Sequence, residues 1–336
     1  MTERIVRTLC YFSDAPDAGV VARLQELDQR LQEAGFAVQT RRVCGRAADL
    51  AALDRLCGMD LPGCLGTLDR NGAETVMDDF LKAGDVSFNL DLGGGVLDTD
   101  ADFLFRIMRA KPSKTFQFTY TFNNPHSSPY FPSAHRERNG FSLGLQPTNL
   151  AAGCTALRPW LQRMQEAWET LCSLLDDEPD FLGIDSSIAP LSGGDGSLVA
   201  FIRRLHGRFA DSVTTDTWLR ISSFIKEYNP RPAGLCGIML PCLEDDELAA
   251  EYAAGEFSVE RNIYLSLHSG LGVDTYPVGV DEKPEKILDI LRTLQGLSNK
   301  YNKPLSARFV SDGRARTGET TDFGNMYLND VVIRPL

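Results

Sequence analysis

The sequence contains four histidines, and its eight cysteines are scattered, without a Cys-x-x-Cys pair or the Cys and His spacing of a zinc site. This pattern excludes zinc-ribbon and dithiol-redox proteins and is typical of free thiols in a reducing compartment. The longest apolar runs fall short of the roughly 18 residues of a membrane span, and the first residues lack a secretory apolar segment. We therefore expect a cytoplasmic protein with eight free thiols and no membrane association.

Basic residues are also few. The chain has 34 Lys and Arg against 46 Asp and Glu, which gives a formal net charge of −12. Nucleic-acid binders need clustered Lys and Arg to displace counterions, so a nucleic-acid partner is excluded. A 43% hydrophobic content is ample for a buried core. Since there is no repeat, low-complexity linker or break in composition, we expect residues 1–336 to form a single α/β domain.

Segments with the pattern of strands alternate along the chain with segments that have the pattern of helices. Residues 4–12 and 36–43 have the composition of buried strands, and residues 18–34 between them repeat apolar residues at helical spacing, which predicts a β-α-β unit with parallel strands. The segment 53–73 holds four glycines and one proline, so we expect most of it to be irregular. Further strands are predicted at 86–90, 115–121, 141–145, 181–185 and 305–310, and helices at 74–82, 101–110, 154–175, 214–228 and 284–299.

Two acidic segments in the C-terminal third of the chain are the main candidates for a ligand site. An apolar run at 235–240 precedes Pro241 and then Glu244 and Asp245, so we predict a strand that stops at the proline with its acids at the C-terminal mouth. Loops at that end of parallel strands bind ligands in α/β folds. A second strand, near His268, carries Asp274 to the same place.

Six segments together resemble a known family. They are I-V-R-T-L at 5–9, F-L-G-I-D-S-S-I-A-P-L at 181–191, G-L-C-G-I-M-L-P-C-L-E-D at 234–245, S-G-L-G-V-D-T-Y-P at 269–277, K-P-L-S-A-R at 303–308 and G-R-A-R-T-G-E-T-T-D-F at 313–323. In this order they resemble the uncharacterised pyruvate-formate-lyase-like proteins, domain of unknown function number 711. The resemblance implies a PFL-like α/β barrel of mainly parallel strands, like that of the glycyl-radical enzymes, with surrounding helices, and a homodimer. It implies no reaction.

The sequence departs from the radical enzymes of that fold in two ways. The C-terminal R-V-x-G segment that carries a glycyl radical is missing, since Gly318 lies in R-T-G-E-T, and no two cysteines are adjacent. Where relatives are expected to carry a cysteine before G-L-G-V-D, this chain has Ser269. Radical chemistry needs a reactive thiol, so we expect non-radical chemistry.

Converging strand ends would bring Asp185, Glu244, Asp245 and Asp274 together, with His268 close by. Clustered carboxylates raise one another's pKa, which suits a general acid or base, or they bind a cation such as Mg²⁺, Mn²⁺ or Ca²⁺, with Mn²⁺, Fe²⁺ or Zn²⁺ if a histidine joins. The alternatives are structural: Asp245 or Asp246 as a helix cap, Asp274 as a turn residue and His268 as a buried histidine bonded to the backbone.

The basic candidates are Arg308 and Arg316, because a guanidinium fork suits a substrate carboxylate, although surface salt bridges are the equal alternative. Ser269 is a further candidate substrate contact. The long loop 123–140 holds His126 and His135, which would bind an anion or share a metal, or remain solvated.

That loop has three prolines and polar hinge residues, so we predict either a lid over the mouth or a fixed dimer contact. Two functions remain open. The first is a lyase- or isomerase-like enzyme acting on a small carboxylate metabolite, with a divalent metal as an optional cofactor. The second is a metabolite-binding protein without catalysis. An enzyme should bring a histidine to the acids; a binding protein need not.

Overall fold

The structure, a computed structural model, describes residues 3–46, 50–57 and 61–336. In this part of the chain ten strands form one sheet in the order β8-β7-β1-β3-β4-β5-β6-β10-β9, with β2 beside β1. The strands are β1 (Arg4–Phe12), β2 (Phe36–Val38), β3 (Arg41–Cys44), β4 (Gly63–Leu68), β5 (Val86–Asp91), β6 (Phe118–Phe122), β7 (Gly140–Leu145), β8 (Phe181–Asp185), β9 (Gly272–Pro277) and β10 (Leu305–Val310). The α-helices are α1 (Ala18–Glu33), α2 (Leu50–Leu56), α3 (Arg70–Lys82), α4 (Asp100–Ala110), α5 (Leu157–Leu174), α6 (Leu198–His206), α7 (Phe209–Ser212), α8 (Thr217–Glu227), α9 (Asp246–Ala254), α10 (Val259–His268) and α11 (Pro284–Tyr301).

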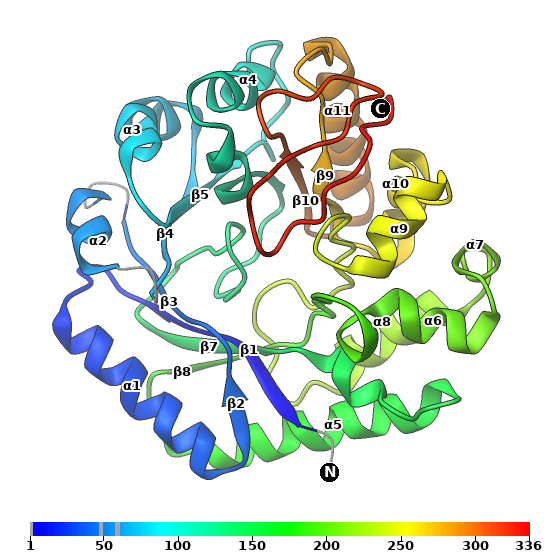
Figure 1. The fold of residues 1–336 in the computed structure, drawn as a ribbon. Helices are drawn as coiled ribbons and strands as arrows, with labels where there is room; N and C mark the ends of the chain where they lie inside the picture. Colours follow the sequence, from blue (N-terminus) through cyan, green and yellow to red (C-terminus); the bar gives the residue numbers. More distant parts are fainter. Residues whose placement is uncertain (1–2, 47–49, 58–60) are drawn as a thin grey trace.

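The sheet consists of three groups of parallel strands. Strands β1 to β6 form the central group, and the pairs β7–β8 and β9–β10 form its two ends, joined to it by antiparallel pairing at β1–β7 and β6–β10. Between the two edge strands, isolated bridges link Ile238 to Ile188 on one side and to Gly270 on the other. The strands lie in an arc around loops, with the helices outside (Figure 1). The predicted α/β class with mostly parallel strands is confirmed.

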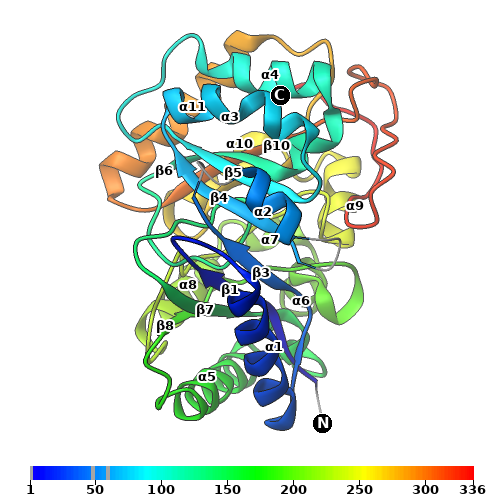
Figure 2. The same cartoon turned by 90° about the vertical axis from the view of Figure 1, so that its left-hand side faces the viewer.

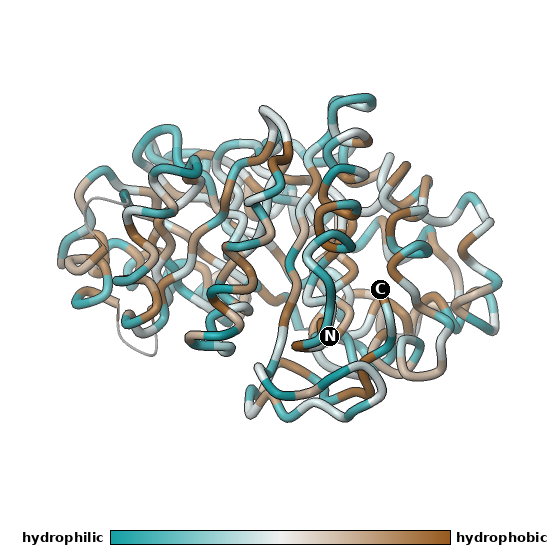
Figure 3. The backbone as a smooth tube through the Cα atoms, turned by 90° about the horizontal axis from the view of Figure 1, so that it is seen from above, coloured by the Kyte–Doolittle hydropathy of each residue, from teal (hydrophilic) through white to brown (hydrophobic). Residues whose placement is uncertain are grey.

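The outer helices are amphipathic and pack on the sheet. Helix α1 begins where the Asp17 carboxylate accepts hydrogen bonds from the Gly19 and Val20 amides, at 2.9 and 3.1 Å. Its residues Leu24, Leu27 and Leu31 are fully buried, whereas the opposite side of the helix faces solvent. Along the outer helices, hydrophobic and hydrophilic residues follow one another within each turn (Figure 3).

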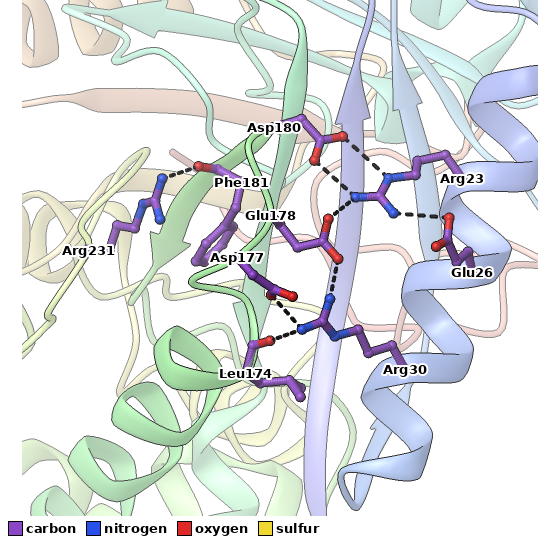
Figure 4. Close-up of polar contacts among 9 residues, drawn as sticks. All are labelled: Arg23, Glu26, Arg30, Leu174, Asp177, Glu178, Asp180, Phe181 and Arg231. Atoms are coloured by element: carbon purple, nitrogen blue, oxygen red, sulfur yellow. Dashed lines mark hydrogen bonds and ion pairs between the residues drawn. The ribbon is translucent and has the colours of Figure 1, made fainter.

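A peripheral ion cluster joins α1 to the connection between α5 and β8 (Figure 4). Glu178 bonds both Arg23 and Arg30. Arg23 also contacts Asp180 at 3.0 Å, and Arg30 contacts Asp177 at 2.6 Å. Segments about 150 residues apart in sequence are therefore tied together by paired charges at the edge of the fold.

Three local predictions are wrong. The segment 53–73 is largely regular, because α2 ends in it and β4 forms between β3 and β5, whose ladders override the low strand propensity of glycine. Residues 235–240 form isolated bridges rather than a strand, since Cys236 has a positive φ of 46° that interrupts the extended backbone. His268 ends helix α10 instead of a strand.

Among the helices of the described residues, none combines the length and apolarity that crossing a bilayer requires.

Candidate functional site

A cavity of about 640 Å³ lies on one side of the sheet. It is lined at the start of four parallel strands: by Arg42 on β3, Pro62 before β4, Ser87 on β5 and Thr119 on β6. Side chains from β1, β9, β10 and the segment 235–244 complete its wall, and Met326 and Tyr327 reach it from the C-terminal segment. That segment, in red, lies on the same side of the molecule as the start of β1 (Figure 2). For β3 to β6 the site is thus at the N-terminal ends, opposite to the mouth expected.

The loop 123–140 explains why the cavity lies at the N-terminal ends of these strands, because the loop fills the interior of the molecule at their opposite ends. Asn89 on β5 donates hydrogen bonds to the carbonyls of Pro132 and Ala134, at 2.8 and 2.9 Å. Tyr130 is buried and donates to the Leu145 carbonyl at 3.0 Å, in space that Gly144 leaves open: a Cβ there would lie 2.4 Å from the Tyr130 hydroxyl. The tip, residues 130–133, forms an inner wall of the cavity. The tip of the loop is therefore enclosed by the sheet at the inner end of the cavity, whereas His126 and Glu137 at its outer end are exposed. A role of that outer end as a lid or a subunit contact stays a prediction.

Asp185 holds this loop in place. Its buried carboxylate accepts hydrogen bonds from the hydroxyls of Ser128 and Ser187, at 2.9 and 2.5 Å, and from the amides of Leu235 and Cys236, at 2.8 and 3.0 Å. Burial raises the pKa of Asp185, while these donors act in the opposite direction. With all its acceptor sites used, the carboxylate joins the loop to the segment that carries Glu244.

The chemical centre of the cavity is a buried arginine between two acids. Arg308 on β10 donates from Nε to Asp274 Oδ1 at 2.6 Å and from Nη2 to Glu244 Oε1 at 2.5 Å. Arg308 and Glu244 are each 7% exposed. The guanidinium also lies over the Phe116 ring, with its Cζ 5.0 Å from the ring centre. Three elements, β9, β10 and the 235–244 segment, thus supply one polar network.

The pKa values in this network follow from burial and pairing. Burial raises the pKa of Glu244, against the opposing effect of Arg308. For Arg308, burial acts to lower the pKa, but Asp274 and Glu244 more than compensate and the pKa is raised. Glu244 is thus a carboxyl that keeps its proton to higher pH than an exposed glutamate.

Two further arginines face the same cavity. Arg7 on β1 lies 3.7 Å from Glu244 Oε2 and donates to Gln39 at 3.3 Å. Arg42 on β3 lies over the Phe131 ring, 4.9 Å from its centre, and its buried Nε has no hydrogen-bond partner among the described residues. Burial, followed by the nearby charge of Arg7, lowers the pKa of Arg42 to about 10. The Arg42 guanidinium therefore stays protonated at neutral pH.

The structure brings together three of the residues singled out in the sequence, Glu244, Asp274 and Arg308. The others lie elsewhere. Asp185 is behind the cavity wall, Ser269 is bonded to Ser222 and to the half-buried His268, and Arg316 is exposed. His126 and His135 contact each other at the outer end of the loop, with ring centres 4.4 Å apart. The cavity lining includes no histidine among the described residues.

The tentative metal set of Asp185, Glu244 and Asp274 does not assemble. No group of three or more His, Cys, Asp or Glu in the described ranges is placed to hold a metal ion. The physical reason is that Arg308 occupies the position between Glu244 and Asp274 that a cation would take, while Asp185 is saturated by its own donors.

Sequence inspection missed Arg7, Arg42 and Tyr130. A signal was present for Arg7, because it stands between the buried residues Val6 and Thr8 of β1, and a charge at such a position needs a partner or a cavity. Arg42 follows Arg41 at the start of β3, where no local pattern distinguishes it. The eight cysteines all carry free thiols in the structure, and the cavity lining includes none of them.

Comparison with known proteins gives a family without an activity. A family model described as "Uncharacterised ACR (DUF711)" matches residues 104–325. The chain is similar to a "UPF0210 protein" of Pyrobaculum arsenaticum, with 27% identity over 94 residues, which is 28% of this chain and 21% of that protein. The match thus spans about a fifth of the relative's length.

Proposed function

The chain belongs to the family described as "Uncharacterised ACR (DUF711)", and because that description states no activity, we propose a function from the cavity itself. The protein is a non-radical enzyme that acts on a small carboxylate metabolite by acid/base chemistry, in the lyase or isomerase class. The observation that carries this proposal is the buried Glu244–Arg308–Asp274 network on the wall of a ligand-sized cavity.

In this proposal Glu244 takes and returns the proton. Its Oε1 is held by Arg308, and its Oε2 faces Arg7 at 3.7 Å, so the second oxygen has the looser contact and is the one available to a substrate. Asp274 positions Arg308 through the Nε bond. Arg308 then stabilises negative charge that develops on the substrate when a C–H proton leaves.

Binding without catalysis is the second candidate. It is favoured by the location of the histidines, none of which lines the cavity among the described residues. The same ligand would then be held by the arginines, with Glu244 serving only to balance their charge.

We extend the family resemblance to a barrel like that of the glycyl-radical enzymes and to a homodimer. The barrel is supported by the bridging segment around Ile238, which lies between the two ends of the sheet, and by the loop inserted into the interior. Composition and the free thiols support the cytoplasmic location. Native mass spectrometry of the purified protein measures the subunit number and any retained ligand.

The test of the enzyme proposal is proton exchange. Small carboxylates that raise the melting temperature are incubated with the protein in D2O, and C–H exchange or conversion is followed by proton NMR. We expect exchange with the wild type and its loss in Glu244→Gln, which keeps the side-chain shape. Glu178→Gln, at the peripheral cluster, is the control. Tight binding without exchange or conversion of any bound carboxylate would establish the binding protein instead.

A further inference from the structure

The charges that line the cavity are paired unequally. Its described lining holds four arginines and four acids. Arg308 is bonded to Glu244 and Asp274, and Arg41 lies 3.7 Å from Asp28. Asp85 accepts a hydrogen bond from Gln117 at 2.5 Å. Only Arg42, among these described arginines, has neither an ion pair nor a side-chain hydrogen bond.

An arginine without an ion pair or a side-chain hydrogen bond needs an explanation, because a buried donor without an acceptor lowers the stability of the fold by roughly 1–3 kcal/mol. Arg42 is held rigidly by the Phe131 face on the loop tip, and it is only partly exposed, toward the cavity that it lines. Its neighbour Arg7 repels it, which raises the cost further. An anion between the two guanidiniums would remove both penalties.

We propose that Arg42, with Arg7 beside it, is the anchor for the carboxylate of the ligand, and that the ligand is a monoanionic carboxylate with an apolar body. The proposal rests on the proposed function and names the substrate class of the same site. A planar guanidinium fork binds a carboxylate through two parallel hydrogen bonds.

The remainder of the lining defines the rest of the ligand. Met239, Leu240 and Leu235 on the bridging segment, with Tyr130 on the loop, give the cavity apolar surface. Of the four arginines in the described lining, Arg42 alone forms no ion pair with an acid, so the site offers one unpaired positive charge, which matches a monoanion rather than a dianion. A phosphate would therefore be repelled where a single carboxylate is accepted.

The assignment also separates two roles among the arginines. Arg308, already held by two acids, stays next to Glu244, where the reaction is proposed to occur. Arg42 and Arg7 hold the end of the ligand that does not react. Fixed at one end, the ligand would present its adjacent carbon atoms to Glu244.

The experiment compares charged and uncharged probes. Benzoate, butanoate, benzamide, butanamide and inorganic phosphate are titrated into wild type, Arg42→Met, Arg42→Lys and Arg41→Met, with binding followed by calorimetry and ligand-observed NMR. Arg41→Met is the matched control, because Arg41 adjoins Arg42 on β3 and lines the same cavity but pairs with Asp28. Circular dichroism and melting temperature verify folding of each variant.

We expect the carboxylates to bind wild type at least about tenfold more tightly than the amides and than phosphate, and Arg42→Met to lose about tenfold or more for the carboxylates alone. Arg42→Lys should recover part of the loss and Arg41→Met should change affinity less than about threefold. The proposal is overturned if Arg42→Met and Arg42→Lys bind carboxylates as wild type does, or if phosphate binds more tightly than the carboxylates.

The outcome is distinguishable from failure of the enzyme proposal. If the affinity for carboxylates falls in Arg42→Met but no carboxylate exchanges protons in D2O, the anchor is supported and the enzyme proposal is wrong. If proton exchange is lost in Glu244→Gln while the affinity is unchanged in Arg42→Met, the enzyme proposal is supported and the anchor is wrong.

Discussion

The peripheral and cavity clusters of arginines and acids differ in which charge is in excess. At the periphery, two arginines meet four acids, and each arginine has at least two carboxylate partners (Figure 4). In the cavity, Arg7, Arg42 and Arg308 meet Glu244 and Asp274, and Arg42 is left unpaired among the described residues. Fully paired charges serve to connect elements of the fold, whereas a guanidinium without a partner is available for a ligand.

Burial separates the clusters as well. Arg23 and Arg30 have side chains 22% and 32% exposed, so water and salt screen their pairs. Arg308 and Glu244 are nearly inaccessible to water, so the loss of one partner leaves a charge that neither water nor salt can stabilise. The three predictions below measure this contrast.

The largest effect is expected from Arg308→Met. It removes the shared partner of Glu244 and Asp274 and leaves two buried carboxylates facing each other, which should lower the free energy of unfolding by about 3–5 kcal/mol. Urea denaturation at pH 7 measures the change. Arg308→Lys, which retains the charge, should lose much less. A loss below about 1 kcal/mol for Arg308→Met would mean that the cavity cluster is as well solvated as the peripheral one.

A smaller effect is expected from Glu178→Gln. The substitution weakens the bonds to Arg23 and Arg30 but leaves Asp180 and Asp177 in place, so we expect a loss of about 1 kcal/mol in the free energy of unfolding. High salt should shrink this loss, while carboxylate affinity stays unchanged. Urea denaturation at low and high salt and calorimetry provide the measurements. Altered ligand affinity would contradict the separation of the two clusters.

The smallest effect is expected in how the free energy of unfolding depends on pH. The folded state raises the pKa of Glu244 above the ordinary 4.5, so above pH 4.5 the unfolded chain releases its proton first. The stabilising contribution of Glu244 therefore decreases as pH rises toward its folded pKa. Asp177 behaves oppositely: the hydrogen bond from Arg30 lowers its pKa below 3.8, so its contribution is present at higher pH and is lost as pH falls.

Stability curves of Glu244→Gln and Asp177→Asn test this difference. In Glu244→Gln the free energy of unfolding should decrease less steeply above pH 4.5 than in wild type. In Asp177→Asn it should decrease less steeply below about pH 4. Curves parallel to wild type for both variants would show that neither carboxyl titrates differently in the folded protein.

The sequence by itself determined the elements with strong local signals. Helices α1, α5 and α11 follow apolar spacing, β1, β5, β8 and β10 follow buried runs, and Asp245 caps α9 by accepting from the Leu248 amide, as its position before the helix indicates. These features depend on neighbours within a few residues. The class of the fold also followed from the order and composition of such segments. Glu244, Asp274 and Arg308 were singled out in the same way, and their role stays a prediction.

Only the tertiary structure decided where these elements place their side chains. Because β9 and β10 run antiparallel to β6, Arg308 reaches the start of the β3–β6 strands, and no sequence pattern states that direction. The insertion of the loop 123–140 depends on contacts with Asn89 and Asp185, both distant along the chain. Arg7 and Arg42 come to face one cavity because β1 pairs with β3, a register set by long-range packing rather than by either arginine's neighbours in sequence.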